Sequence, residues 1–346
     1  MSKNKKTKWL VPVIMIMVLL ASACGNNSKN SANGPDPGES NSAGSPSGNA
    51  STIGFTVPTL NNPFFVDMQK GAEQAAAERG LKLIMVGGDN DITKQVKQVE
   101  DFIQNKVDVI VIQTVDTTGI VPAIKQANQS DIPVLTTAET PSGGEIVTSI
   151  GFDSYESGRN GGEFIAKELN GKGNVVELIG VLGQETSRLK SDGFKYALSK
   201  YPDIKLLDSQ PAQYDRSTAM TVMENYLQKY QQIDAVYAAN DEMALGAVQA
   251  IKAAGKLDQI KVMGNDGTDD ALKAVKEGEM IATNATPAFI QGYIAIDMAD
   301  RTLKGEKLPD TIKEKNFIIT KDEVDDADNI LKGVEEDKRY WLEQLK

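Results

Sequence analysis

The sequence contains no histidine and only one cysteine among its 346 residues. Without histidine, the chain cannot use Ser-His-Asp or Cys-His catalysis, and it cannot hold zinc through an imidazole. A single cysteine can form neither an intrachain disulfide nor a thiolate cluster. These absences exclude the enzyme classes that depend on such groups. We therefore assign no catalytic residue, no metal ligand and no cofactor to the chain.

Basic residues are fewer than acidic ones, with 37 Lys and Arg against 48 Asp and Glu, for a net charge of −11. Four of the lysines (Lys3, Lys5, Lys6 and Lys8) lie in a segment that we expect to be removed. Its loss leaves 33 basic residues against 48 acidic ones, a net charge of −15. Such a chain offers no basic footprint for a phosphate backbone, so nucleic acid is not an expected partner.

An uncharged run of 14 residues, Leu10 to Ala23, follows these lysines. As a helix it would extend about 21 Å at 1.5 Å per residue, which is short of the roughly 30 Å hydrocarbon core of a bilayer. A basic start, a short apolar stretch and small residues at its end are typical of a signal peptide. The sequence therefore predicts a signal peptide over residues 1–23.

The only cysteine stands directly after this run, in Leu20-Ala21-Ser22-Ala23-Cys24. This segment resembles a bacterial lipobox, in which the cysteine is diacylated and becomes the new N-terminus. An ordinary secretory signal followed by an incidental free cysteine is the alternative. Because two or three acyl chains anchor a protein stably, lipidation of Cys24 predicts a protein tethered to the extracytoplasmic face of the cell membrane.

A polar segment follows the cysteine. In residues 25–50, 20 of the 26 side chains are Gly, Ser, Asn or Pro. Such a composition cannot bury enough apolar surface to fold. We interpret residues 24–50 as the lipidated cysteine and a flexible linker.

From Thr52 onward, short apolar runs alternate with stretches of helix-forming composition, and 40% apolar content in a chain of this length is enough for two cores. Continuous apolar strands separated by helices are typical of parallel sheets covered on both faces. The sequence therefore predicts an α/β protein with two doubly wound parallel-sheet lobes. The expected strands cover residues 53–57, 81–86, 107–112, 134–137, 148–152, 175–178, 204–207, 235–238 and 260–263. The expected helices cover residues 64–79, 92–105, 120–129, 187–200, 217–230 and 243–254.

Neither the Gly-x-Gly-x-x-Gly nor the Gly-x-x-x-x-Gly-Lys-Ser/Thr nucleotide fingerprint is present. In open parallel sheets, ligands bind beyond the carboxyl ends of the strands, so residues that follow strands are the candidates for a site. Asn62 before Pro63 fits a helix cap. Asn240 and Asp266 also precede predicted helices, but their loops carry more polar side chains than a cap requires.

Four motifs in this order carry a family resemblance: Thr59–Phe65 (TLNNPFF), Gln210–Arg216 (QPAQYDR), Asn240–Ala247 (NDEMALGA) and Asp266–Thr268 (DGT). They resemble the type I periplasmic monosaccharide-binding proteins of ABC importers, of the ribose-binding kind, here in lipoprotein form. The similarity runs from about Ile53 to Ile319. It implies two lobes around a sugar, with aromatic rings against the C–H faces and planar polar side chains around the hydroxyls.

Carried over residue by residue, the resemblance implies a set of ligand contacts on both lobes. Arg188 offers a fork of donors, Asp266 accepts from two hydroxyls, and Tyr214 takes a position that is usually aromatic. The implied contacts are Asn62, Phe64 and Phe65 on the first lobe, and Arg188, Tyr214, Asn240 and Asp266 on the second lobe or at the hinge.

The sequence departs from the family pattern where ribose binders present an Asp-Arg pair, because Ala138 and Glu139 stand there. Thr286 stands where the family uses Gln. A donor fork is thus replaced by an acceptor-only carboxylate, and the neighbouring acceptor is lost. We expect Glu139 and Thr286 to contact a ligand other than ribose, namely a different pentose, a hexose or a polyol. A ligand that carries a positive charge is an open alternative. The alternative for Glu139 is a side chain that points to solvent.

The resemblance also implies how the chain is divided. Three crossovers are expected near Phe152-Asp153, Thr286-Pro287 and Lys313 to Ile319. The expected parts are a first lobe of residues 51–152 plus 287–315, a second lobe of residues 153–286 plus 316–325, and a C-terminal tail of residues 326–346. From Lys321 onward, Asp322, Glu323, Asp325, Asp326 and Asp328 suggest either a cation site or, as we favour, a solvated acidic surface.

The resemblance predicts a binding protein whose lobes close on a sugar or polyol and then dock on a membrane permease driven by an ATPase. We expect a monomer. A sensor that presents a sugar or a furanosyl signal molecule to a membrane receptor is the main alternative, because its binding physics would be identical. An enzyme would need a carboxylate or lysine constellation that we do not find. A transcription regulator would need a basic helix-turn-helix where this chain has a signal peptide and linker.

Overall fold

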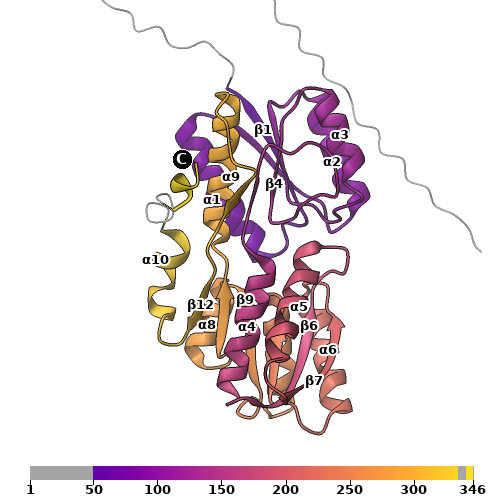
Figure 1. Cartoon of the computed structure of the whole chain (residues 1–346), viewed down its shortest axis with the longest axis vertical. Coiled ribbons are helices and arrows are strands. Elements are labelled where there is room, and N and C mark those ends of the chain that lie inside the picture. Colours follow the sequence, from indigo (N-terminus) through magenta and orange to yellow (C-terminus); the bar gives the residue numbers. More distant parts are fainter. Residues whose placement is uncertain (1–49, 334–339, 346) are drawn as a thin grey trace, which may run out of the picture. The chain divides into compact units, whose positions relative to one another are not determined.

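The computed structural model describes residues 50–333 and 340–345 of the chain. The predicted signal peptide, Cys24 and the linker up to residue 49 lie outside these residues. In the described part, strands and helices alternate and form two six-stranded sheets, each with helices packed against it (Figure 1). No helix in this part is both long enough and apolar enough to cross a bilayer.

The first sheet has the strand order β11-β5-β4-β3-β1-β2, and every neighbouring pair is parallel. We call this sheet and its helices the first lobe. Its elements are β1 (Thr52–Val57), α1 (Pro63–Arg79), β2 (Lys82–Gly87), α2 (Ile92–Gln104), β3 (Val109–Ile112), α3 (Val121–Gln129), β4 (Val134–Thr137), β5 (Ser149–Gly151), α9 (Ala288–Leu303) and β11 (Thr311–Lys313).

The second sheet has the order β12-β10-β9-β8-β6-β7, in which only β12 runs antiparallel to its neighbour among the pairs described. We call this sheet and its helices the second lobe. Its elements are α4 (Ser154–Glu168), β6 (Lys172–Ile179), α5 (Glu185–Leu198), β7 (Asp203–Pro211), α6 (Arg216–Lys229), β8 (Ala235–Ala238), α7 (Asp241–Ala253), β9 (Lys261–Asp266), α8 (Asp269–Glu277), β10 (Ala282–Ala285) and β12 (Phe317–Thr320).

The predicted fold class is confirmed, because two parallel-sheet α/β lobes are present. The central strands show why the two sheets could be predicted from the sequence. All four residues of β3 (VIVI) and of β8 (AVYA) are buried, as expected for strands covered by helices on both faces. The apolar runs did not predict α4, α8, α9 or the strands β10 to β12, which are also part of the fold.

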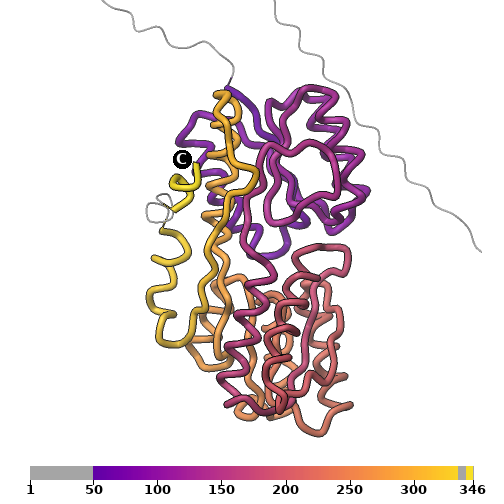
Figure 2. Tube along the Cα trace, viewed as in Figure 1, coloured from indigo at the N-terminus to yellow at the C-terminus, as the bar shows by residue number. Residues whose placement is uncertain are grey.

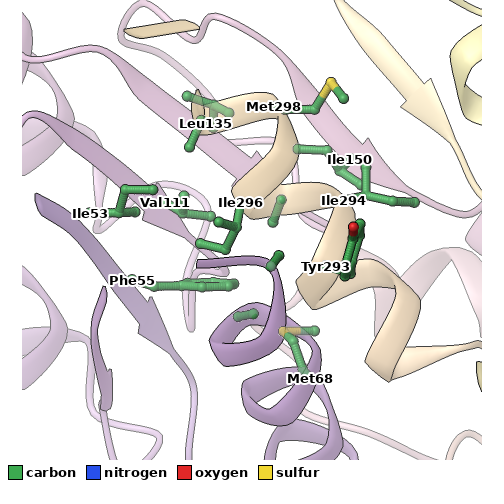
Figure 3. Packing of buried hydrophobic residues seen from close by; sticks show 14 of the residues in the cluster. Ile53, Phe55, Met68, Val111, Leu135, Ile150, Tyr293, Ile294, Ile296 and Met298 are labelled. Carbon is green, nitrogen blue, oxygen red and sulfur yellow. The ribbon is translucent and has the colours of Figure 1, made fainter. Parts of the chain in front are cut away.

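The chain passes from one sheet to the other three times: after β5, after β10 and after β11. The second passage returns α9 to the first lobe, where it lies beside α1, and Figure 2 shows this orange segment next to the indigo one. Figure 3 shows the core that results, with Ile294, Ile296 and Met298 of α9 packed over strand residues such as Ile53 and Val111. Segments more than 200 residues apart thus share one core.

The C-terminal segment continues beyond β12 through a short 3-10 helix, Val324–Asp326, and α10 (Ala327–Lys332). Trp341 is 1% exposed and lies in the first-lobe core, with its ring 6.2 Å from that of Tyr293. The acidic stretch before α10 is mostly exposed, and Asp325 accepts from Lys276 at 2.6 Å. No group of three or more potential metal ligands occurs among the described residues.

Candidate functional site

A cavity of about 260 Å³ lies between the two lobes. Its lining residues follow strands β1 to β5 of the first lobe and β6 to β8 of the second, or end strand β9. The cavity is therefore at the carboxyl ends of the parallel strands, where such sheets bind ligands. Pockets for drug-sized molecules span roughly 300–1,000 Å³, so this volume suits a compact ligand.

The first-lobe wall is built around the start of α1. Asn62 caps this helix, because its Oδ1 accepts from the Phe64 backbone N–H at 2.9 Å, which leaves the amide NH₂ as a donor. The rings of Phe64 and Phe65 lie edge to face at 5.2 Å and line the cavity. Asn62 therefore caps α1 and lines the cavity at the same time. Its role as a helix cap does not conflict with a role in ligand binding.

The second-lobe wall contains Asn240 and Tyr214. Asn240 Oδ1 accepts from the Met243 backbone N–H at 3.0 Å, so its free amide NH₂ matches that of Asn62. Tyr214 has a φ of 57° in the left-handed region, and burial raises the pKa of its hydroxyl. Its ring passes so close to Gly180 that a Cβ there would lie 2.1 Å from Tyr214 Cζ. Glycine is therefore required beneath this ring.

Lys190 lines the cavity, as does Arg216, and neither was among the expected ligand contacts. Its side chain is 4% exposed, and Nζ donates to the Ala239 carbonyl at 3.0 Å and lies 5.3 Å from the Phe152 ring centroid. Burial lowers the pKa of Lys190, whereas the carboxylates of Asp266 and Asp241 oppose that shift. A buried ammonium of this kind provides donors in a site shielded from water.

Asp266, at the end of β9, also lines the cavity. Burial raises the pKa of Asp266 well above its ordinary value, and the charge of Lys190 opposes the shift. Its φ of 124° is unusual for a non-glycine residue, so the surrounding structure holds it in a strained conformation. Lys190 and Asp266 together supply a donor and an acceptor of opposite charge.

Asp241 supports the loop that carries Asp266. Its carboxylate accepts from the backbone N–H groups of Gly267 and Thr268, both at 2.8 Å, and from Thr283 Oγ1 at 2.7 Å. Burial raises the pKa of Asp241 to about 6. Asp241 does not line the cavity, so its role is to hold the loop that carries Asp266 in place.

Arg188 does not reach the cavity, contrary to the position that the resemblance implied for it. Its side chain is 59% exposed and pairs with Glu185 at 3.7 Å and Asp192 at 3.1 Å on the outer face of α5. Thr186 and Lys190, four residues apart, share the face that lines the cavity. This i, i+4 spacing was the available signal for Lys190.

Glu139 is neither exposed nor part of the cavity lining. Its carboxylate accepts from the backbone N–H groups of Glu185 and Thr186 and from Thr186 Oγ1, all in the second lobe. Burial raises the pKa of Glu139, and the hydrogen bonds from Thr186 oppose that shift. The solvent-facing alternative for Glu139 is wrong, because the side chain is 1% exposed.

Thr286 lies at the second passage between the sheets and does not line the main cavity. Its Oγ1 accepts from Asn316 Nδ2 at 2.7 Å, which ties this passage to the third one. Several cavity residues were missed in the sequence analysis although they follow strands or lie near strand ends. They include Asn90, Gln113, Gln184, Thr186 and Gln213 and the charged residues Asp215, Arg216 and Glu242.

The structure therefore brings together six of the nine residues that the sequence analysis assigned to a ligand. Those that line the cavity are Asn62, Phe64, Phe65, Tyr214, Asn240 and Asp266. Arg188, Glu139 and Thr286 lie outside the lining. Aromatic rings, amides and charged side chains of both signs line a small space between two lobes, which defines a ligand-binding protein of the two-lobed α/β class.

Comparisons with known proteins agree with this class. The model of the family described as "Periplasmic binding protein domain" matches residues 53–307. The ribose import binding protein of Bacillus subtilis is 41% identical over 261 residues, which cover 75% of this chain and 84% of that protein. The xylitol-binding protein of Mycolicibacterium smegmatis is 33% identical over 291 residues, 82% of each chain.

A solved structure gives the same result. The ABC transporter solute-binding protein from Bacillus halodurans with bound myo-inositol superposes with a TM-score of 0.77 at 33% identity, and the match covers 82% of this chain and 98% of that one. The chain belongs to the periplasmic binding protein family, in its type I branch, as the sequence resemblance indicated. Members of this family are binding proteins and not enzymes, and they work outside the cytoplasm.

Proposed function

We propose that this chain is an extracytoplasmic solute-binding lipoprotein that captures a monosaccharide or polyol other than ribose and delivers it to the permease of an ABC importer. The observation that carries the proposal is the cavity between the lobes, where aromatic rings and free polar groups meet. Sugars have apolar C–H faces and an equator of hydroxyls, which such a lining fits. No bond of the ligand is made or broken.

We propose that the sugar contacts Phe64, Phe65 and Tyr214 through its apolar faces. Asn62 and Asn240 donate to hydroxyls, Lys190 donates from the second lobe, and Asp266 accepts. Each such hydrogen bond contributes about 0.5–1.5 kcal/mol, or roughly 1.5–3 kcal/mol when one partner is charged. Lys190 thus makes the donor contact to the sugar that the sequence resemblance implied for Arg188.

The exclusion of ribose rests on the loop after β4. Ala138 lines the cavity but offers no side-chain acceptor, and the carboxylate of Glu139 is used by α5. Two side-chain partners that the family pattern offers ribose are therefore missing. The relatives' varied ligands, which include xylitol and myo-inositol, support a different pentose, a hexose or a polyol.

Closure of the lobes is the proposed switch, because each lobe supplies part of the lining and only the closed form completes it. We propose that two parts of the chain move toward each other when the protein closes. The first lobe consists of residues 51–152 and 287–315, and the second of residues 153–286 and 316–325. Residues 326–346 form a tail. The closed face then docks on the permease. The sensor alternative is not favoured, because the relatives named above are import or solute-binding proteins.

A melting-temperature screen tests the ligand class. We expect the largest increase with a pentose, hexose or polyol other than ribose, because a ligand at 100 times its Kd stabilises the folded state by about 2.7 kcal/mol. The panel contains ribose, xylitol, myo-inositol and common hexoses. Asp266→Asn serves as the control and should reduce the shift. A largest shift with ribose would overturn the exclusion of ribose, and no shift with any sugar or polyol would overturn the proposed function.

The lipid anchor rests on the sequence around Cys24, which lies outside the described residues. We expect Cys24→Ala to abolish metabolic labelling with a radioactive fatty acid and to release the protein into the medium. Ser22→Ala is the matched control, since it keeps small residues before the cysteine and should stay labelled. Continued labelling of Cys24→Ala would show that the acyl chain is attached elsewhere.

A further inference from the structure

The side chain of Glu139 links the two lobes through hydrogen bonds. Glu139 follows β4 of the first lobe, whereas its three hydrogen-bond partners stand at the start of α5 in the second. Oε2 accepts from Glu185 N at 2.9 Å and from Thr186 N at 3.3 Å, and Oε1 accepts from Thr186 Oγ1 at 2.5 Å. The lobes are thus joined directly beside the cavity, which Thr186 lines and Glu139 does not.

These contacts provide acceptors for the N–H groups at the start of α5, which its own N-cap side chain does not provide. The first N–H groups of a helix have no partner within it and are usually satisfied by the side chain of the N-cap residue. The N-cap residue of α5 is Gln184, whose side chain makes no capping hydrogen bond. The Glu139 carboxylate takes that role from the other lobe, and its negative charge also suits the positive end of the helix dipole.

The backbone around Glu139 holds its side chain in this direction. Ala138 has a φ of 58°, in the left-handed region, and its N–H donates to the Ile150 carbonyl at 2.7 Å. The Glu139 N–H donates to the Thr137 carbonyl at 2.6 Å, which closes a tight turn. A carboxylate that is 1% exposed is costly unless donors surround it. Those donors are in place only while the lobes are together.

We propose that Glu139 is a positioning residue that holds the closed form by capping α5 from the opposite lobe, and that it does not contact the ligand. This inference rests on the closure mechanism of the proposed function. Through the cap, Glu139 fixes the start of the helix that carries Thr186 and Lys190 into the cavity. Loss of the carboxylate therefore reduces the closed population and lets a bound ligand escape faster, whatever its chemical identity.

Disulfide trapping measures the closed population without a ligand. Gly183 of the second lobe lies near Asp116 of the first, since a Cβ on Gly183 would be 3.3 Å from Asp116 Oδ2. In the full chain carrying Cys24→Ala, Asp116→Cys and Gly183→Cys, the rate of cross-linking under a copper oxidant reports how often the lobes meet. We expect Glu139→Ala to lower this rate about tenfold or more, because charge-assisted hydrogen bonds to three donors are lost.

Two further variants separate the cap from general effects. Glu139→Gln keeps an oxygen that accepts from backbone N–H groups, so it should restore part of the rate. Glu145→Ala removes an exposed carboxylate from the same connection between β4 and β5 and should leave the rate unchanged. Melting temperatures show whether each variant is folded. A cross-linking rate that does not depend on Glu139 in folded protein would overturn the inference.

The outcome is separable from that of the proposed function. Sugar binding is measured on the unmodified chain with the screen described above. A chain that binds no sugar or polyol, but whose cross-linking depends on Glu139, refutes the proposed ligand class and supports the interlobe cap. A chain that binds a sugar, but cross-links equally fast with Glu139→Ala, supports the proposed function and refutes the cap.

Discussion

Replacing Lys190 by methionine is expected to weaken binding of the sugar or polyol by about 30-fold, or roughly 2 kcal/mol, the range for a hydrogen bond to a charged group. Methionine keeps most of the buried stem, so the cavity wall stays filled. It removes the only lysine that lines the cavity in the described part of the chain. It also removes the positive charge that opposes the rise in the pKa of Asp266.

Titration calorimetry with the panel compound that gives the largest melting shift measures this loss. Arg188→Met is the matched control, because it removes a positive charge from the same helix two residues away. That side chain is 59% exposed and pairs with Glu185 and Asp192, so its loss should leave the affinity unchanged. Equal losses in both variants, or a loss with Arg188→Met alone, would show that α5 presents a different face to the ligand.

The contrast between these two residues shows how far the sequence determines the site. Residues that end strands or begin the next helix could be found, because parallel strands bring their carboxyl ends together. Asn62, Asn240 and Asp266 were found in this way and line the cavity. On α5, the choice between Arg188 and Lys190 depends on the rotation of the helix, which the packing against α4 decides.

Glu139 shows a second limit. The sequence offered two interpretations for it, a ligand contact and a solvent-facing side chain. Two of the three observed donors are backbone N–H groups of the opposite lobe, and the third is the Thr186 hydroxyl. Backbone donors have no residue signature, so the pattern of side chains did not predict this contact. Only the approach of two lobes, which is a property of the whole fold, creates it.

The fold was more predictable than the site, and its missing helices have physical reasons. The six helices that composition predicted are all present. Helix α4 was not expected, because its sequence SYESGRNGGEFIAKE carries three glycines, which disfavour an isolated helix. In the structure these glycines are at positions where α4 approaches neighbouring elements closely. Tertiary packing therefore overrides local propensity here.

Replacing Gly158 by alanine is expected to lower the free energy of unfolding by about 1–2 kcal/mol. A Cβ at Gly158 would lie 1.9 Å from the carbonyl oxygen of Lys190, so α4 and α5 would have to separate. Overpacking of this kind costs roughly 1–3 kcal/mol and sometimes more, whereas the gain in helix propensity is only about 1 kcal/mol. Because the contact is with backbone, no side-chain rotation can relieve it.

The same displacement should reach the site, because the atom that must move belongs to Lys190. We therefore expect Gly158→Ala to reduce ligand affinity as well as stability, which chemical denaturation and calorimetry measure separately. Gly143→Ala is the matched control, since its Cβ would meet Val121 at an ordinary 3.4 Å and lies outside the cavity lining. Unchanged stability in Gly158→Ala would mean that α4 and α5 do not pack this closely. Lost stability with full affinity would mean that Lys190 is positioned independently of α4.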